Sequence, residues 1–373
     1  MKKWFSFALL LILMGVIVFM MNGCSVNEKL GRFFGNTVEN TTDVANSFNE
    51  IEILCDTADV TIIPSESGER KVVALDKKKI NYTVTVDGDT LRIKAVDERR
   101  WFEKIMDFGK SKLDVYIPAG EYGNLRIDAS TADITVPESF TFADISIERS
   151  TGEVKLAANA VGNVNIKGST GDTVVENVTC GSLDIKYSTG KIYLTNIISV
   201  GDVKMEGSTG DMLLNGVSFK SISTIGDTGD LIAGNLNGTE GVYVKRSTGD
   251  VTLSNVVCTD MNVIVSTGRT ELTNVACHSF ATKGSTGDIT MANLIAEGLI
   301  DIERSTGDVY FDRCDAAEIE VETETGYVKG TLLTNKIFQV RTSSGKIDVP
   351  ESWEGGKCKI TTTTGSVKIS IGQ

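Results

Sequence analysis

His278 is the only histidine in this 373-residue chain, so a Ser-His-Asp triad would have to be built around it. Its surroundings, ACHSFAT, suggest no such triad. No GxSxG, HExxH, P-loop or dinucleotide-binding fingerprint occurs in the sequence either. We therefore expect His278 to lie at a surface or corner of the fold, and we predict that the protein is not an enzyme.

An acidic column after a repeated Ser-Thr-Gly turn is the best candidate for ligand binding. Stacked carboxylates could bind Ca²⁺, which prefers several oxygen ligands from flexible acidic sites. The other interpretation is a solvated row in which interspersed basic residues relieve charge repulsion. Both stay open, and no cofactor is predicted. The column contains Asp172, Asp211, Asp230, Asp250, Asp288 and Asp308, interrupted by Lys191 and Arg269.

The cysteines show no CxxC pair and no metal-finger spacing, so they do not predict a metal site. Most lie in strand-rich regions, where a free cysteine behaves as a small apolar core residue. Cys258 and Cys277 occupy the same position in successive repeats, so a disulfide between them is geometrically possible. The seven are Cys24, Cys55, Cys180, Cys258, Cys277, Cys314 and Cys358.

The first residues predict export from the cytoplasm. Lys2 and Lys3 precede an uncharged apolar run from Trp4 to Met21, which is just long enough to span a membrane. MNGC at residues 21–24 resembles a bacterial lipobox, which would place a lipid on Cys24. An uncleaved anchor and a lipidated Cys24 are equal alternatives, and both hold the protein on the outer face of the cell membrane.

The charge balance argues against a nucleic-acid partner. The formal net charge is −13, from 50 acidic and 37 basic residues. Phosphate binding needs clustered lysines and arginines, and the sequence contains no such cluster.

A Thr-Gly or Ser-Gly turn recurs every 19 or 20 residues through most of the chain. Looser copies place Ala132 and Ala58 at the same kind of turn. Glycine permits a positive φ at such a turn without steric cost. The turn glycines are Gly152, Gly171, Gly190, Gly210, Gly229, Gly249, Gly268, Gly287, Gly307, Gly326, Gly345 and Gly365.

Apolar residues alternate on both sides of each turn glycine, as at Val242 and Val244 before Gly249 and at Val251 and Leu253 after it. This alternation indicates two short strands per repeat. A unit of 19 or 20 residues can bury its inward face only by stacking on its neighbours. The sequence therefore predicts an all-β, single-domain parallel β-solenoid.

Asparagines recur six residues after the turn glycine. Asparagine tolerates the left-handed region, and stacked amides can bond one another along the axis. We expect a structural ladder at a second corner, formed by Asn177, Asn196, Asn235, Asn255, Asn274 and Asn293.

Four segments are predicted: a signal anchor or lipoprotein signal at 1–24, a linker at 25–47, an irregular coil or cap at 48–124, and regular repeats at 125–373. Near-helical spacing of aromatics in RRWFEKIMDFGK, residues 99–110, predicts a helix capping the solenoid end. The alternative is a contact of Trp101, Phe102 and Phe108 with a membrane or partner. At the other end we expect the last coil, GSVKISIGQ, to be uncapped and able to dock a partner or another copy.

The STGDV and STGDI coils, preceded by DTADVTI, STADITV and an anchoring N-terminus, resemble the bacterial putative-adhesin family, a β-solenoid domain of unknown function. The resemblance covers roughly residues 48–371. It implies a location on the cell envelope, in some cases beside envelope-stress regulatory systems, and it supplies no catalytic residues.

Three functions compete. The first is a non-catalytic, adhesin-like rod, tethered to the outer face of the cytoplasmic membrane, that binds a protein or cell-wall polymer. The second is an accessory or sensor component of an envelope-stress system. The third is a polysaccharide-acting enzyme, because β-helices host such enzymes with paired carboxylates. The constant 19- or 20-residue interval leaves no loop long enough for a cleft, which disfavours the third.

Overall fold

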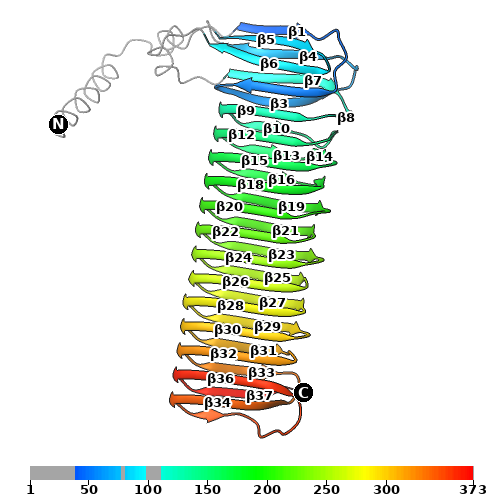
Figure 1. Cartoon of the computed structure of the whole chain (residues 1–373). Coiled ribbons are helices and arrows are strands. Elements are labelled where there is room, and N and C mark those ends of the chain that lie inside the picture. Colours follow the sequence, from blue (N-terminus) through cyan, green and yellow to red (C-terminus); the bar gives the residue numbers. More distant parts are fainter. Residues whose placement is uncertain (1–37, 77–79, 98–110, 373) are drawn as a thin grey trace, which may run out of the picture.

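The strands of the chain stack into one long rod (Figure 1). The computed structural model describes residues 38–76, 80–97 and 111–372. All regular secondary structure in these residues is β-strand, and the two large sheets contain 16 and 18 strands. The predicted parallel β-solenoid is confirmed.

Several predictions concern residues outside this description. The apolar N-terminal run, Cys24, and the aromatic segment with Trp101, Phe102 and Phe108 all lie there. In the part of the chain that is described, no helix has the length and apolar character needed to cross a membrane.

Each regular coil contributes one strand to each large sheet, as β24 (Gly241–Thr248) and β25 (Val251–Val257) illustrate. The chain turns between these two strands at residues 249–250. Residues 258–259 then lead into β26 (Asp260–Thr267) of the next coil. β24 and β26 are parallel neighbours in the 16-stranded sheet. Successive coils therefore stack in register, with equivalent positions above one another.

The other coils from residue 120 to residue 332 place most of their strands in the same two sheets. Those of the 16-stranded sheet are β9 (Leu125–Thr131), β12 (Ile145–Thr151), β15 (Asn163–Thr170), β18 (Ser182–Thr189), β20 (Val203–Thr209), β22 (Ile222–Thr228), β28 (Ser279–Thr286), β30 (Leu299–Thr306) and β32 (Glu318–Thr325). Those of the 18-stranded sheet are β10 (Ile134–Val136), β13 (Val154–Leu156), β16 (Thr173–Glu176), β17 (Thr179–Cys180), β19 (Ile192–Ser199), β21 (Met212–Phe219), β23 (Leu231–Gly238), β27 (Thr270–Cys277), β29 (Ile289–Ala296), β31 (Val309–Cys314) and β33 (Val328–Leu332). A third sheet of three short strands contains β8 (Gly120–Tyr122), β11 (Phe140–Phe142) and β14 (Asn159–Ala160).

The inward side chains form one continuous core along the rod. In the coil of β24 and β25 they alternate regularly until Asn255, whose φ of 54° interrupts the alternation within β25. Before this corner every second side chain is buried. Across the corner, the next buried side chain after Leu253 is that of Val256, three residues later. Asparagine therefore restores the inward direction of the chain on the third side of the coil.

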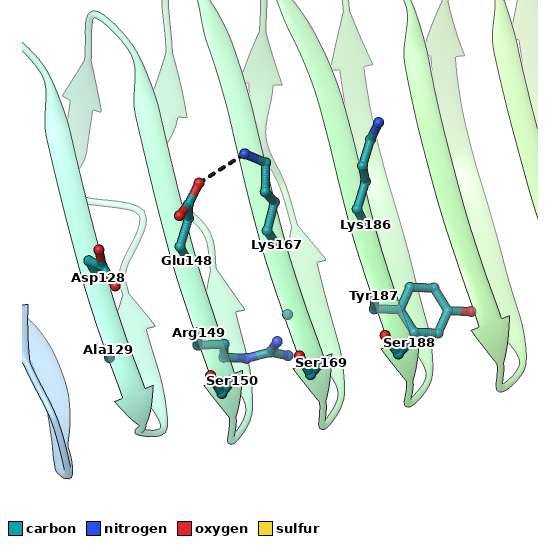
Figure 2. Close-up of a pocket in the computed structure, with 11 residues that line it drawn as sticks. Asp128, Ala129, Glu148, Arg149, Ser150, Lys167, Ser169, Lys186, Tyr187 and Ser188 are labelled. Carbon is teal, nitrogen blue, oxygen red and sulfur yellow. Dashed lines mark hydrogen bonds and ion pairs between the residues drawn. The ribbon is translucent and has the colours of Figure 1, made fainter.

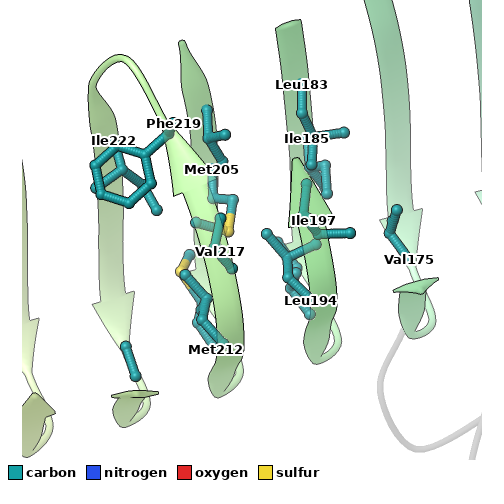
Figure 3. Close-up of a cluster of buried hydrophobic side chains, with 14 of the residues drawn as sticks. Val175, Leu183, Ile185, Leu194, Ile197, Met205, Met212, Val217, Phe219 and Ile222 are labelled. Atoms are coloured by element: carbon teal, nitrogen blue, oxygen red, sulfur yellow. The ribbon is translucent and has the colours of Figure 1, made fainter. Parts of the chain in front are cut away.

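Aliphatic, methionine and aromatic side chains fill the space between the sheets (Figure 3). Met205 of β20 and Met212 of β21 lie between the two sheets there, and both are completely buried. Full burial of one such side chain contributes about 1.5–3 kcal/mol relative to exposure. Because each coil covers its neighbours, this contribution depends on stacking.

At the N-terminal end of the rod, the chain forms additional strands beyond the first coil. The first coil, β2 (Glu50–Cys55) and β3 (Ala58–Ser65), pairs directly with β9 and β10. The intervening residues add a further parallel coil, β6 (Thr90–Asp97) and β7 (Ser111–Pro118), which stacks on β2 and β3. Beyond this coil lie β4 (Lys71–Asp76) and β5 (Ile80–Asp87). β5 pairs antiparallel with β6, and β4 with β7.

One predicted boundary needs correction at this end. β1 (Val38–Asp43) pairs antiparallel with β4, so residues 38–43 belong to the solenoid and not to a linker. Their polar composition gave no strand signal; pairing with β4 decides their conformation.

The stacking order at the opposite end also differs from the prediction. β36 (Gly356–Thr364) lies between β32 and β34 (Lys336–Ser344), and β37 (Val367–Ile371) lies between β33 and β35 (Ile347–Asp348). The expectation that GSVKISIGQ is the exposed last coil is therefore wrong. The longer connection at residues 349–355 lets the chain return past β34 and β35, and the repeat spacing alone does not reveal this return.

Candidate functional site

The turn glycines form a column in which each backbone touches the next. A Cβ atom on Gly249 would lie 2.1 Å from the carbonyl oxygen of Gly229 in the preceding coil. Gly249 also has a φ of 139°, in the region that side chains disfavour. Gly326 and Gly345 lack this positive φ, but a Cβ on either would be equally crowded. Close approach of stacked backbones is thus the common requirement.

The aspartates after the turn bond the backbone of the next coil. The Oδ1 atom of Asp250 accepts a hydrogen bond from the Arg269 N–H at 2.7 Å, and Asp230 accepts one from the Asp250 N–H at 2.8 Å. Similar bonds join other coils of the column. The described residues contain no cluster of three or more acidic, histidine or cysteine side chains suited to a metal ion. These hydrogen bonds to the backbone of the next coil explain why aspartate recurs at this position, and they require no calcium ion.

Asp250→Ala should lower the free energy of unfolding by about 1 kcal/mol, because the Arg269 N–H loses its acceptor. Asp250→Asn keeps an oxygen acceptor and should lose less. Arg269→Ala is the matched control, since among the described residues the Arg269 side chain bonds only the exposed Glu271 carboxylate. Urea unfolding of the three variants measures these differences. Equal stability of the alanine variant at position 250 and the parent would contradict the assignment.

The asparagines that were expected at a corner have φ values of 54–56°. Their side-chain amides donate along the axis, for example from Asn274 to Asn255 at 3.0 Å and from Asn293 to Asn274 at 3.0 Å. One coil departs from the pattern: Gly216 takes the left-handed position and the neighbouring Asn215 supplies the amide oxygen. Asn215 thus serves Asn235 in a coil that lacks asparagine at the expected position, but no hydrogen bond among the described residues joins Asn215 to Asn196.

The cysteines of the described residues are free and buried. Cys258 and Cys277 lie in the wall of a hollow of about 440 Å³, which His278 and Glu297 also line. Burial raises the pKa of the Cys258 thiol to about 12 and that of Cys277 to about 11. Thiols with such pKa values are protonated at neutral pH and are poor nucleophiles.

His278 is exposed, as expected, and its Nδ1 atom lies 3.5 Å from the Glu297 carboxylate. No serine or cysteine of the described residues is hydrogen-bonded to this imidazole. The arrangement forms no activated nucleophile.

An interior column of large side chains was not predicted from the sequence. Arg149, Arg246 and Arg304 stand three residues before turn glycines and are at most 5% exposed. Each guanidinium extends over a glycine of an adjacent coil, as Arg246 does over Gly226. The signal was present as arginines and a tyrosine interspersed with glycines at one repeat position, and it appears only when the coils are aligned.

A shallow hollow of about 360 Å³ lies on the outer face of the 16-stranded sheet, across β9, β12, β15 and β18 (Figure 2). Its outward side chains come from two columns that follow the rod axis. The first column changes from acidic to basic, and the second consists of serines. They are Asp128, Glu148, Lys167 and Lys186, and Ser150, Ser169 and Ser188.

Part of the charged column is already paired. Lys167 lies 2.9 Å from Glu148 and lowers the pKa of that carboxyl through a hydrogen bond. Lys186 lies 3.4 Å from Glu206. The three serine hydroxyls are exposed and have no hydrogen-bond partner among the described residues. The hollow therefore offers a row of available hydroxyls beside a row of charges.

These features define the class: a parallel β-solenoid whose repeated polar residues mainly join one coil to the next. The Toastrack DUF4097 family matches residues 48–254, 182–326 and 239–373. The chain belongs to this family, and the resemblance inferred from its turn motifs is confirmed. Among curated proteins, none matches this chain.

The solved structures that match this chain are distant from it. A putative adhesin from Bacteroides fragilis is 14% identical with a TM-score of 0.25, covering 90% of this chain and 97% of that one. A putative adhesin from Parabacteroides merdae is 14% identical with a TM-score of 0.24, covering 90% and 98%. A putative lipid binding protein from Parabacteroides distasonis is 12% identical with a TM-score of 0.23, covering 90% and 98%. At such scores these likenesses say nothing about ligands of this chain.

Proposed function

We propose that this protein is a non-catalytic rod, tethered outside the cytoplasmic membrane of a bacterial cell, that binds a cell-wall polymer or an envelope protein along its side. The residue types that could perform chemistry have other roles in the described coils. Aspartate oxygens accept backbone hydrogen bonds, asparagine amides bond one another, and the thiols are buried. A binding role needs none of them.

The hollow of Figure 2 is the surface that we assign to binding. The observation that carries this choice is the row of exposed serine hydroxyls without partners, beside Lys167 and Lys186. Because the row repeats once per coil, it presents equivalent groups about 4.8 Å apart. A ligand with a regular repeat of hydroxyl or amide groups could use several coils together.

Sedimentation of the full chain with cell walls isolated from its own host cells tests this role. We expect Ser169→Arg, which places a large side chain in the hollow, to weaken binding by roughly tenfold or more. Ser285→Arg is the matched control, because Ser285 stands in the same serine column but outside this hollow. Equal binding of both variants, or no binding of the parent to walls or to envelope proteins, would overturn the proposal.

The tether has a separate test. Mass spectrometry of the mature N-terminus should find either the intact apolar run of residues 4–21 or a diacylglyceryl group on Cys24 with residues 1–23 removed. Both results support attachment to the membrane. Recovery of the unmodified full chain in the cytoplasm would contradict it.

A further inference from the structure

The end of the rod formed by β34 and β35 leaves its core open. Phe338 and Val340 of β34 are only half-buried, and Ile347 of β35 is 49% exposed. Their register partners one coil inward, Cys358, Ile360 and Val367, are at most 1% exposed. The same interior columns therefore continue to this end, where the described residues cover them only in part.

The backbone at this end is also unpaired. β34 is the terminal strand of the 16-stranded sheet, and β35 pairs only with β37 among the described strands. A nine-residue edge strand with free N–H and C=O groups is a template for a further strand.

We propose that this end binds the same end of a second copy, through antiparallel pairing of the two β34 strands. A twofold axis through Val340 sets Val340 opposite its own copy and Phe338 opposite Thr342, all of which point inward. On the outer face it sets Gln339 opposite Arg341, so no like charges meet. Lys336, the only other charged residue of β34, is buried against the Asp315 carboxylate. The strand is thus self-complementary, as an isologous interface requires.

The other end of the rod is a poorer partner for this surface. At that end the 16-stranded sheet stops at β5, which pairs with β6. The 18-stranded sheet continues from β7 through β4 to β1, so it is one strand longer there (Figure 1). That end is stepped, and residues 39–43 of its outermost strand are polar and exposed. β34 and β35 instead end at the same level. Head-to-tail growth into a filament is therefore disfavoured, and a closed pair is favoured.

If the proposed tether is correct, pairing places the two anchors at opposite ends of a rod about 140 Å long. This arrangement suits two facing membranes, and this consequence alone rests on the proposed function. The pairing itself requires no tether and is tested on isolated protein.

Light scattering of the detergent-purified full chain should give twice the monomer mass at micromolar concentration, and Val340→Lys should give the monomer mass. Two lysines would then face each other at the twofold axis. Val96→Lys is the matched control, because Val96 is 40% exposed in β6 at the other end. A monomeric parent, or a dimer that Val340→Lys leaves intact, would overturn the proposal.

Disulfide trapping checks the register without altering the core. A mixture of Gln339→Cys and Arg341→Cys proteins should form a crosslinked pair on mild oxidation, since these residues stand opposite each other across the junction. Either variant alone should crosslink far less. Equal crosslinking in all three samples, or none in the mixture, would contradict this pairing even if the protein is dimeric.

Discussion

Gly249→Ala should destabilise the rod by more than about 3 kcal/mol, the largest loss that we expect from a single methyl group. The new Cβ would lie 2.1 Å from the Gly229 carbonyl oxygen and 2.7 Å from its carbon. These are backbone atoms of the turn between β22 and β23, both of which are paired, so no side-chain rotation relieves the contact. The φ of 139° adds strain for alanine. Chemical unfolding followed by circular dichroism measures the loss.

Gly241→Ala is the control within the same coil. A Cβ on Gly241 would approach only the Asp260 carbonyl oxygen, at 3.5 Å, which is an ordinary contact. Gly241 also lacks a positive φ. We expect this variant to unfold within about 1 kcal/mol of the parent. Similar losses for both variants would show that close stacking at the turn is not what requires glycine.

Arg246→Met should raise the free energy of unfolding by about 1–3 kcal/mol. Arg246 is 1% exposed, and none of its three guanidinium nitrogens has a hydrogen-bond partner among the described residues. Burial lowers its pKa, an effect that outweighs the opposing influence of Tyr187, Asp211 and Asp230. Methionine keeps the apolar stem over Gly226 and removes the desolvated charge.

Arg149→Met is the matched comparison with the opposite expected sign. The Nη2 atom of Arg149 donates to the carbonyl oxygens of Gly171 and Asp172 and to the Thr173 hydroxyl, at 2.8–3.2 Å. Its removal should lower the free energy of unfolding by about 1–2 kcal/mol. Equal destabilisation by the two substitutions in urea unfolding would contradict the distinction between a bonded and an unbonded arginine.

Much of the solenoid could be predicted because its constraints repeat. The 19- or 20-residue spacing of the turn glycines and the alternation around them indicate coils that must stack. The same spacing indicates a corner at the asparagines, whose left-handed conformation shifts the alternation between Leu253 and Val256. The role of Asp250 could not be predicted this way, since its partner is a backbone N–H of another coil.

The sequence by itself determined the coil: its length, its turn, its inward face and the need for neighbours. Only the tertiary structure decided the order of coils at the two ends, where β36 returns between β32 and β34 and where β1 joins the cap. The physical reason is that the repeat pattern shows only that each coil must stack on another coil of the same kind. Which particular neighbour it meets depends on connections such as residues 349–355 and on pairing between distant segments.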